Sequence, residues 1–408
     1  MPIHLRTMGI IRLLVADTAP LYPPLWGGPK RIWNLYSNLG DNFDVTYIGI
    51  DCGLGKIYFN RRIRDNFREV IRPITKIYYL FRYFELKFLK NTAFDIFIHI
   101  CIILDKGLKR ELNKNKADIL IASHPWTSVC FRIKRGQVFI YDAHNCEYIL
   151  IREILKGRWC KGIISFFVRL IERDACRKAD IIIAASETDK ELFVKLYGVE
   201  RKKIFIVPNG VSVKGVPSYE KRKEARIRLN ISDDNPVLLF IGTRYKPNAE
   251  AAQFIINEVA LRLPESNIVL LGGVSEYFRN ISAPKNVRMV GRVNDIELYD
   301  WLAAADIGIN PMFSGSGTNM KVLDYFSFGL PVIATWMGIR GIDGVNFKDF
   351  IACREDEFAD KIKLLLDNAD LRKSMGRNAR KLAGEIYDWE KISMELKCIL
   401  SNAIKSGC

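Results

Sequence analysis

The stretch between Ala305 and Thr335 has the residue types and spacing of an anion-binding site. Its pattern predicts a buried strand that ends near Asn310, a flexible Gly-Ser-Gly-Thr loop, and a helix that begins around Thr318. Glycines let the backbone come close to a ligand, and the free N–H groups at a helix start bind anions. The stretch therefore predicts phosphate binding; the alternative is a flexible loop with an ordinary helix cap at Thr318.

Two charged residues on the predicted helix favour the phosphate interpretation. Lys321 falls within about the first turn, where its ammonium group adds a full positive charge. Asp324 lies one turn further along and can accept hydrogen bonds from ribose hydroxyls. The candidate binding set in this stretch is Gly315, Ser316, Gly317, Thr318, Asn319, Lys321 and Asp324.

The chain has only four histidines, at positions 4, 99, 124 and 144, and two of them follow predicted strands. His124 comes after the apolar run Ile119 to Ala122, and His144 comes after the run Val138 to Tyr141. Ligands of parallel sheets bind beyond the carboxyl ends of the strands, so both residues are candidates for a site. A purely structural role is the alternative for each.

Structural roles are easy to define for two of the histidines. His144 could simply hydrogen-bond Asp142 or Glu147 and so fix its loop. His99 lies in an apolar run and is predicted to be structural.

Metal ligands and disulfides are not indicated. The nine cysteines are scattered, and none forms a C-x-x-C pair. No D-x-D motif occurs, and no His/Cys/Asp cluster has metal-ligand spacing. We expect no bound metal, no cofactor, no signal peptide and a reducing cytoplasm, and no apolar run is long enough to span a membrane.

Short apolar runs that alternate with helical stretches predict the elements that hold these residues. At 408 residues the chain exceeds one ordinary core, and such runs occur on both sides of a turn at Pro208-Asn209-Gly210 and a linker from 211 to 219. The predicted strands are 11–16, 45–50, 119–122, 138–141, 181–184 and 204–207, then 237–241, 268–271, 287–290, 307–310 and 332–334; predicted helices include 30–39, 220–229, 250–262 and 295–304.

The pattern predicts an α/β fold of two Rossmann-like, doubly wound domains that face each other across a cleft. We expect an N-terminal, acceptor-binding domain at 1–212 and a C-terminal, donor-binding domain at 213–387. Residues 388–408 are expected to form a helical segment that packs back on the N-terminal domain. The ligand site is expected in the cleft.

The net charge of +16 is concentrated in one segment. Between Lys56 and Lys116 there are 15 Lys/Arg, 6 Asp/Glu and eleven aromatic residues. Basic residues interleaved with aromatics suit an anionic membrane surface. An ordinary solvated face with aromatics in the core is an equal alternative, whereas nucleic acid is disfavoured because no nucleic-acid motif is present.

Several motifs together resemble those of the family 4 glycosyltransferases (group 1, glycogen-synthase-like). The stretch 305–335 is similar to the family's "ADI-x-I-x-P", "K-x-L-E" and "G-x-PV-x-AT" elements, in the same order. Residues 179–187 with 207–211 look like its "AD-x-VI-x-x-SE … VPNGV" region. Leu239 to Thr243 and Val290 to Val293 resemble its "F-x-G" and "GRV" strand ends. The resemblance covers nearly the whole chain and is weakest from about 55 to 115.

The resemblance implies a GT-B fold and metal-independent, retaining transfer of a sugar from a nucleotide-diphosphate donor, with UDP the default nucleotide. Gly27 and Gly28 resemble the family's glycine loop after the first strand. Tyr141 to Glu147 resembles a "D-x-HN-x-E" element of one branch, and His124 matches the functional histidine of the N-terminal domain. The implied set is His124 and His144 as catalytic residues, with Gly27, Gly28, Arg244, Lys246 and Arg292 added to the donor-binding set.

The sequence departs from the family pattern in two places. The family's paired acids, eight residues apart, correspond to Ser316 and Asp324, so the first acid is missing and the second is shortened. The usual basic pair after "F-x-G" is also displaced, since Thr243 and Asn248 occupy those positions. Arg244 and Lys246 are candidates to replace it, and an ordinary solvated loop is the alternative. The first change suggests altered sugar recognition.

The expected acceptor is a glycan or a lipid-linked saccharide, and the expected location is the cytoplasm or the inner face of the membrane. A nucleotide-sugar 2-epimerase of the same fold and a catalytically silent binding module are the alternatives, because fold alone does not fix function.

Overall fold

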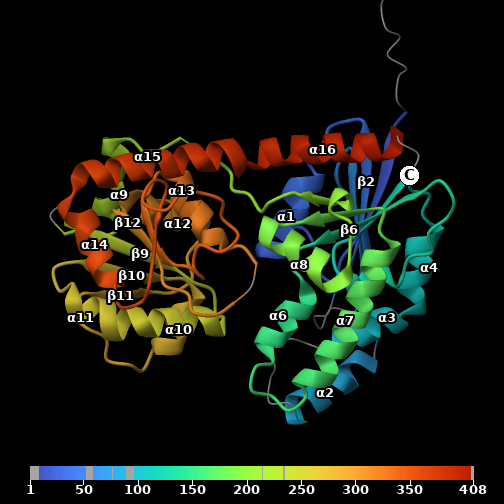
Figure 1. The fold of residues 1–408 in the computed structure, drawn as a ribbon, viewed down its shortest axis with the longest axis horizontal. Coiled ribbons are helices and arrows are strands. Elements are labelled where there is room, and N and C mark those ends of the chain that lie inside the picture. Colours follow the sequence, from blue (N-terminus) through green and yellow to red (C-terminus); the bar gives the residue numbers. More distant parts are fainter. Residues whose placement is uncertain are drawn as a thin grey trace, which may run out of the picture. The chain divides into compact units, whose positions relative to one another are not determined.

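The structure is a computed structural model that describes residues 9–51, 58–75, 77–88, 96–213, 215–232, 235–315 and 317–405. The chain separates into two compact units (Figure 1). Unit 1 comprises Met1–Pro208 together with Glu390–Cys408, and unit 2 comprises Asn209–Trp389. Each unit is an α/β structure built on its own sheet, so the expected pair of Rossmann-like domains is confirmed.

The sheet of unit 1 has the strand order β3-β4-β2-β1-β5-β6-β7-β8. All neighbouring strands are parallel except β3, which is antiparallel to β4. The strands are β1 (Ile11–Ala16), β2 (Phe43–Asp51), β3 (Phe59–Arg64), β4 (Phe67–Pro73), β5 (Ile119–Ala122), β6 (Val138–Ala143), β7 (Ile181–Ala184) and β8 (Ile204–Ile206).

The helices of unit 1 supply its hydrophobic core. Alternate strand residues such as Leu14 and Leu120 pack with Ile102, Trp126 and Phe193 in one cluster, as the two-residue repeat of a strand requires. The helices are α1 (Gly27–Tyr36), α2 (Ile77–Phe88), α3 (Ile96–Leu104), α4 (Lys106–Lys114), α5 (Pro125–Ser128), α6 (Glu147–Ile154), α7 (Lys161–Lys178) and α8 (Glu187–Tyr197), followed by a 3₁₀ turn at Arg201–Lys203.

The C-terminal helix α16 (Trp389–Lys405) belongs to unit 1 from Glu390 onward. Its buried apolar residues beyond Glu390 recur at helical spacing and share one face of the helix. These residues are Ile392, Leu396, Leu400 and Ala403.

The sheet of unit 2 is parallel throughout and has the order β11-β10-β9-β12-β13-β14. Odd and even residues of its strands enter different cores: Leu238 packs in one cluster, and Leu239 packs in the cluster on the opposite face. The strands are β9 (Val237–Ile241), β10 (Asn267–Leu271), β11 (Val287–Val290), β12 (Ile307–Asn310), β13 (Val332–Thr335) and β14 (Ile351–Cys353).

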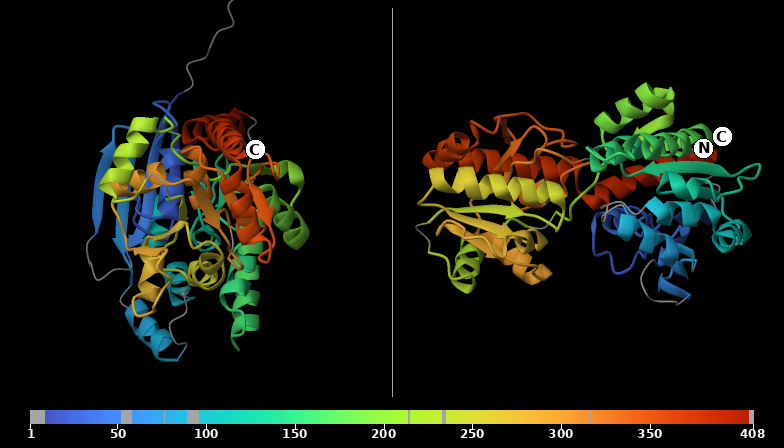
Figure 2. Two further views of the ribbon diagram at one scale, coloured as in Figure 1. Left: turned by 90° about the vertical axis from the view of Figure 1, so that its left-hand side faces the viewer. Right: turned by 90° about the horizontal axis from the view of Figure 1, so that it is seen from below.

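Helices cover both faces of this second sheet (Figures 1 and 2). One core includes residues of α10 and α14, and the other includes residues of α12, α13 and α15. The helices are α9 (Tyr219–Arg228), α10 (Lys246–Phe254), a π-helical segment (Ile255–Val259), α11 (Ala260–Arg262), a 3₁₀ segment (Gly273–Phe278), α12 (Asp295–Ala304), α13 (Met320–Ser327), α14 (Phe358–Asp367) and α15 (Ala369–Ile386).

Three Ala-Asp steps fix the register of the parallel strands. Asp118, Asp180 and Asp306 each precede a strand and accept the backbone N–H of a residue in the neighbouring strand, at 2.8 to 2.9 Å. The N–H of each aspartate in turn donates to the carbonyl of that same residue, so each pair is bonded in both directions. These aspartates therefore have structural roles. Two of them, Asp180 and Asp306, are the aspartates of the "AD" pairs in the two family-like motifs.

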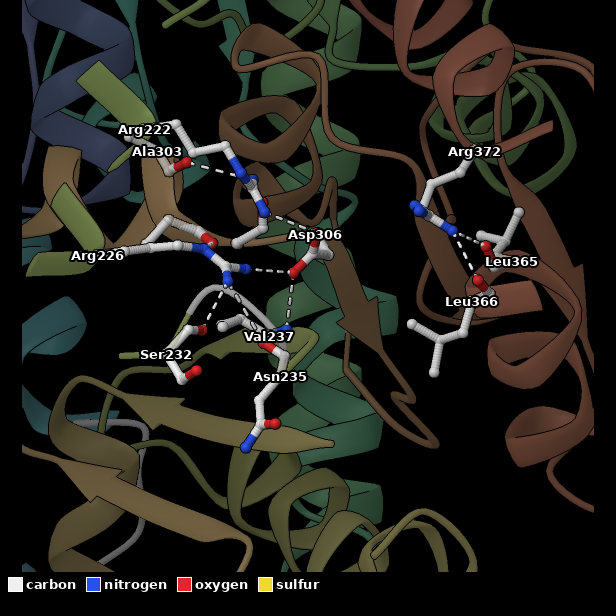
Figure 3. A network of polar contacts seen from close by, with 12 residues as sticks. Arg222, Arg226, Ser232, Asn235, Val237, Ala303, Asp306, Leu365, Leu366 and Arg372 are labelled. Atoms are coloured by element: carbon white, nitrogen blue, oxygen red, sulfur yellow. Dashed lines mark hydrogen bonds and ion pairs between the residues drawn. The ribbon is translucent and has the colours of Figure 1, made fainter. Parts of the chain in front are cut away.

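Asp306 also ties α9 to the sheet of unit 2 (Figure 3). Arg222 and Arg226 donate to its two carboxylate oxygens at 2.7 and 2.6 Å. Arg226 bonds the carbonyl of Ser232 as well, and Arg372 joins the last turn of α14 through the carbonyl of Leu366 at 2.9 Å. Arginines with several hydrogen-bond partners, of which Arg226 is buried, thus join these helices to the rest of unit 2.

Most predicted strands occur where the apolar runs placed them, but β3, β4 and β14 were not predicted. The helix expected at 30–39 begins at Gly27, so Gly27 and Gly28 form its first turn rather than a loop. The helix expected at 250–262 spans 246–262 and contains a π-helical segment. Within the described ranges, no helix combines the length and apolarity needed to cross a membrane.

Candidate functional site

Three neighbouring strands of unit 1 end in polar side chains. Asp17 follows β1, His124 comes two residues after β5, and His144 follows β6 directly. Because these strands are parallel and adjacent, their carboxyl ends share one edge of the sheet. His124 Nδ1 lies 2.7 Å from Asp17 Oδ1, and the rings of His124 and His144 are 4.8 Å apart between centroids.

Two further residues complete this group, which we call the histidine cluster (Asp17, Gly28, His124, His144 and Glu147). Glu147, at the start of α6, is buried with its Oε1 3.9 Å from His124 Nε2. A Cβ at Gly28 would lie 3.7 Å from His144 Nδ1, so the first turn of α1 approaches that ring. The structure thus brings together three predicted residues and adds Asp17 and Glu147.

The electrostatics of the cluster separate its two histidines. Burial by itself lowers the pKa of His124, but the charge and hydrogen bond of Asp17 outweigh it and raise the pKa to about 9. Burial, helped by the charge of His124, lowers the pKa of His144 to about 4. At neutral pH His124 is therefore an imidazolium ion, and His144 is a neutral ring.

The two acidic groups of the cluster also differ. Burial raises the pKa of Glu147 to about 7 despite the nearby charge of His124. Burial pushes the pKa of Asp17 in the same direction, but the charge and hydrogen bond of His124 hold it below its usual value. Asp17 is thus a permanent counter-ion, while Glu147 can take up or release a proton near neutral pH.

A second layer of buried charge supports the strand ends. Asp142 accepts hydrogen bonds from Arg31 at 3.0 Å and from the Tyr36 hydroxyl at 2.7 Å, which ties β6 to α1. Glu172 of α7 accepts the backbone N–H groups of Glu147 and Tyr148 at 2.7 and 3.0 Å. Asp142 is therefore engaged with α1, and neither Asp142 nor Glu147 is bonded to His144 in the way that the sequence suggested as an alternative.

In unit 2 the predicted cation Lys321 lies on the first turn of α13. Its Nζ donates to Asn248 Oδ1 at 2.8 Å and lies 4.2 Å from the centroid of the Phe240 ring. Burial lowers the pKa of Lys321 to about 7, and no charged group contributes to that shift. Asn248 itself is held by two bonds to Thr243, so the ammonium group sits in a neutral, fixed cradle.

The loop before α13 has glycines that adopt positive φ, 122° at Gly315 and 69° at Gly317, which favours glycine over other residues. The predicted residue Ser316 lies outside the described residues. Asn319 precedes the helix without capping it, and its side chain donates instead to the carbonyl of Met337 at 3.0 Å. Thr318 Oγ1 is buried beside Gly341 and has no hydrogen-bond partner within the described part of the chain.

The other predicted cations of unit 2 are much more exposed. The side chains of Arg244, Lys246 and Arg292 are 63%, 84% and 72% exposed. Arg244 and Arg292 both approach Glu276, at 3.7 and 3.2 Å, beside a cavity of about 640 Å³ that Glu276 and Arg292 help to line. Lys246 lies 3.7 Å from Glu250.

Sequence reasoning missed Asp17, Glu147 as a member of the cluster, and Asn248 as a partner of Lys321. The rule that selected His124 and His144 would have selected Asp17 too, because it is the first residue after a buried strand. Asn248 was noted only as a departure from a basic pair, and nothing in the sequence places it against Lys321, 73 residues away.

The chemistry open to these groups follows from their charge states. His124 can donate a hydrogen bond and a positive charge, Glu147 can accept a proton, and Lys321 can bind an anion that raises its pKa again. The described residues contain no group of three His, Cys, Asp or Glu side chains placed to hold a metal ion. The expectation of metal-independent activity remains a prediction.

Comparisons with known proteins agree across both units. A family model of "Glycosyl transferases group 1" matches residues 235–368, and one of "Glycosyltransferase Family 4" matches residues 59–214. The chain is also similar to an uncharacterized glycosyltransferase of Methanocaldococcus jannaschii, with 23% identity over 288 residues, or 67% of this chain and 70% of that protein. Other curated relatives match over 56% and 62% of their own length.

Solved structures resemble the chain over nearly its full length. A sucrose-phosphate synthase from Thermosynechococcus elongatus has a TM-score of 0.74 at 14% identity and covers 97% of this chain and 100% of its own. The HepE protein of Anabaena, in complex with UDP and glucose, has a TM-score of 0.68 at 14% identity, covering 96% and 99%. At this identity the likeness shows the fold, which is GT-B.

Proposed function

Because the chain belongs to the group 1 glycosyltransferases of family 4, we propose that it moves a hexose from a nucleotide-diphosphate donor, with UDP as the nucleotide, to a glycan or lipid-linked acceptor. Its structural neighbour HepE binds UDP and glucose, which supports the choice of donor. The single observation that carries the proposal is the placement of Lys321 at the start of α13, beside the loop of Gly315 and Gly317.

The Lys321 cradle suits a leaving diphosphate. The bond between sugar and diphosphate breaks with growing negative charge on the phosphate oxygens, and fixed positive charge nearby stabilises that change. The partners of Lys321 within the described ranges are all neutral, so a diphosphate would supply the counter-ion that these residues do not. The N–H groups at the start of α13 and the glycine loop supply further donors, and Asp324 is proposed to bind the ribose hydroxyls.

The histidine cluster is proposed to act on the sugar side of the reaction. The His124 imidazolium can donate to a hydroxyl or to a phosphate oxygen, and Asp17 keeps it charged and oriented. Glu147, with a pKa of about 7, is the group best suited to accept the acceptor's proton. His144 is proposed to orient donor groups beside Gly28.

We further propose that transfer retains anomeric configuration and needs no metal. Support for metal independence comes from the fixed cations already described, which can balance the diphosphate charge without Mg²⁺. Arg244, Arg292 and Lys246 are exposed around the site in unit 2 and are proposed as secondary phosphate or base contacts.

The basic segment 56–116 is proposed to meet an anionic membrane surface on the cytoplasmic side, where a lipid-linked acceptor would lie. Its described part is only partly consistent with an ordinary solvated face: Phe67 and Tyr78 are buried, whereas Tyr58, Leu80 and Tyr83 are exposed. Exposed aromatic and aliphatic side chains among arginines and lysines support the membrane interpretation.

Calorimetric titration of the full chain with UDP, GDP, ADP and CMP, with and without EDTA, tests the donor assignment. We expect one nucleoside diphosphate, UDP, to bind tightly and without sensitivity to EDTA. Lys321→Ala and Asp324→Ala should each abolish or greatly weaken that binding. Near-normal affinity in both variants would show that the donor site is elsewhere.

A UDP-sugar consumption assay, with and without a membrane extract, separates transfer from epimerisation. A transferase should need the extract for full turnover, whereas a 2-epimerase should convert the UDP-sugar without it. Absence of any nucleotide-induced change in melting temperature at millimolar concentration would instead favour a silent binding module.

A further inference from the structure

Helix α7 has an apolar face that points away from the core of unit 1. Ser165, Val168 and Glu172 lie on its buried side. On the outer side, four apolar residues recur at i, i+3, i+4 and i+7, and Trp159 precedes them in the α6–α7 turn. These five side chains, which we call the outer stripe, are Trp159, Ile163, Phe166, Phe167 and Leu170, and they are between 44% and 81% exposed.

The spacing of the outer stripe makes it a continuous surface. Positions i, i+3, i+4 and i+7 lie on one side of a helix, so the four α7 side chains are neighbours. Single exposed apolar residues are ordinary in folded proteins, but a contiguous group that includes Trp and two Phe marks an interaction site.

Basic residues border the stripe. Arg169 and Arg173 lie beside it on α7, and Lys156 and Lys161 lie near Trp159. Of the residues that the structure describes, no acidic side chain forms an ion pair with any of these four. Their positive charge is therefore available to a partner.

Two shallow cavities connect the stripe with these cations. One, of about 420 Å³, is lined by Phe166, Leu170, Leu196 and Tyr197 with Arg169 and Arg173. The other, of about 400 Å³, shares Phe166 and Arg169 and adds Arg152 and Lys161. Each cavity thus has an apolar wall and a cationic rim, which fits the boundary between acyl chains and phosphate headgroups.

We propose that the outer stripe and its basic border bind the surface of an anionic phospholipid bilayer. Trp and Phe side chains would enter the headgroup boundary, and the arginines and lysines would meet lipid phosphates. Two copies of this surface facing each other would bring Arg169 and Arg173 against their own counterparts, so charge favours an anionic bilayer over self-association.

This surface differs from segment 56–116 and is independent of the proposed transferase activity. The lower end of unit 1 in Figure 1 contains both the α6–α7 pair and α2, and Figure 2 shows the same two groups of helices reaching that end. The inference adds a bilayer contact on α7 to the one proposed for segment 56–116, so the matched comparison uses exposed apolar residues of unit 2.

Vesicle flotation of the full chain, without nucleotide, tests the proposal. The vesicles contain either phosphatidylcholine alone or phosphatidylcholine with phosphatidylglycerol. We expect binding to the anionic vesicles only. The pair Phe166→Ser and Phe167→Ser should weaken this binding by at least about tenfold, since two interfacial aromatics are lost. The pair Arg169→Gln and Arg173→Gln should weaken it by about tenfold and flatten its dependence on salt.

The control pair is Tyr219→Ser and Ile227→Ser, which removes similarly exposed apolar side chains from α9 in unit 2. This pair should change binding by less than about twofold. Unchanged binding of the phenylalanine pair, or equal binding to neutral vesicles, would overturn the proposal. So would a shift in oligomeric state of the phenylalanine pair with its vesicle binding intact, because the stripe would then join copies of the chain.

The variants also keep the test separate from protein stability and from the donor site. All substituted residues are exposed, so circular dichroism melting should show wild-type folding for each pair. Nucleotide titration of the same variants should be unchanged, and failure of nucleotide binding in the wild type would contradict the transferase proposal while leaving the bilayer result to stand by itself.

Discussion

The two candidate sites differ in how their charges are balanced. In the histidine cluster, the cation His124 has a buried counter-ion, Asp17, at 2.7 Å, and a second carboxyl group nearby. In unit 2, the partners of Lys321 among the described residues are the neutral side chains of Asn248, Phe240 and Met312. The histidine cluster thus contains its own ion pair, whereas the Lys321 site would obtain its counter-ion from a bound anion.

The pKa values express this difference directly. Asp17 raises the pKa of His124 to about 9, whereas burial without a counter-ion lowers the pKa of Lys321 to about 7. In an internally balanced site the charged groups stabilise one another, and their protonation states change little when a ligand binds. An unbalanced site costs stability in the free protein and gains affinity for an anion.

The largest expected effect comes from Lys321→Met, which removes the charge but keeps a chain to pack on Phe240. We expect nucleotide affinity to fall about 100-fold, or about 3 kcal/mol, because a charged hydrogen bond to phosphate is lost. Melting temperature should stay the same or rise, since the free protein no longer buries an unbalanced cation. Calorimetry and thermal melting measure the two quantities, and a clear loss of stability would show that Lys321 is balanced after all.

Removing the counter-ion from the other site should act mainly on stability. Asp17→Asn should lower the free energy of unfolding by roughly 2–3 kcal/mol at about pH 6. The folded pKa of His124 lies above its unfolded value, so this contribution is complete below about pH 6.5 and disappears as pH rises through about 9. Denaturant unfolding at several pH values measures it.

NMR titration provides the control for Asp17→Asn. With the carboxylate gone, burial should bring the pKa of His124 below its ordinary value, while the pKa of His144 should rise because its charged neighbour is lost. An unchanged pKa near 9 in the variant would mean that Glu147, not Asp17, holds the proton on His124.

The strands were predicted most accurately where burial determines which residues the sequence can have. A buried parallel strand is mostly apolar, and the bounds of β5, β7 and β12 match the predicted runs at 119–122, 181–184 and 307–310. Strand β3 was missed because it is an antiparallel strand at the sheet edge with the sequence Phe-Asn-Arg-Arg-Ile-Arg, in which Arg61 interrupts the apolar alternation between Phe59 and Ile63.

The same limit applies to the sites. The ends of strands and helices can be predicted locally, so His124 and Lys321 were singled out by position, and their functional roles remain predictions. Which strands become neighbours depends on the order β2-β1-β5-β6, and only this order brings Asp17 within 2.7 Å of His124, 107 residues away. Counter-ions of this kind are properties of topology and are not encoded in a local motif.

The difference between the two sites also predicts a pH effect on binding. Lys321 must be protonated to bind a diphosphate, and its pKa in the free protein is about 7. Nucleotide affinity should therefore fall about fivefold between pH 7 and pH 8, with uptake of a proton on binding. Calorimetry in two buffers of different ionisation enthalpy measures that proton. A flat profile over this range would place the pKa of Lys321 well above 8.

The smallest effect is expected from the exposed cations, which sharpen the contrast with Lys321. Lys246 is 84% exposed and already lies 3.7 Å from Glu250, so it can give a bound phosphate only a solvent-screened contact. Lys246→Ala should lower nucleotide affinity by less than about threefold, because exposed ion pairs typically contribute only about 0.5 kcal/mol. Arg244→Ala is the matched second variant, since Arg244 is also exposed and near an acid. A loss of nucleotide affinity in either variant as large as that expected for Lys321→Met would contradict this prediction. Phosphate recognition would then depend on Arg244 and Lys246, and the contacts of Lys321 would have only a structural role in α13.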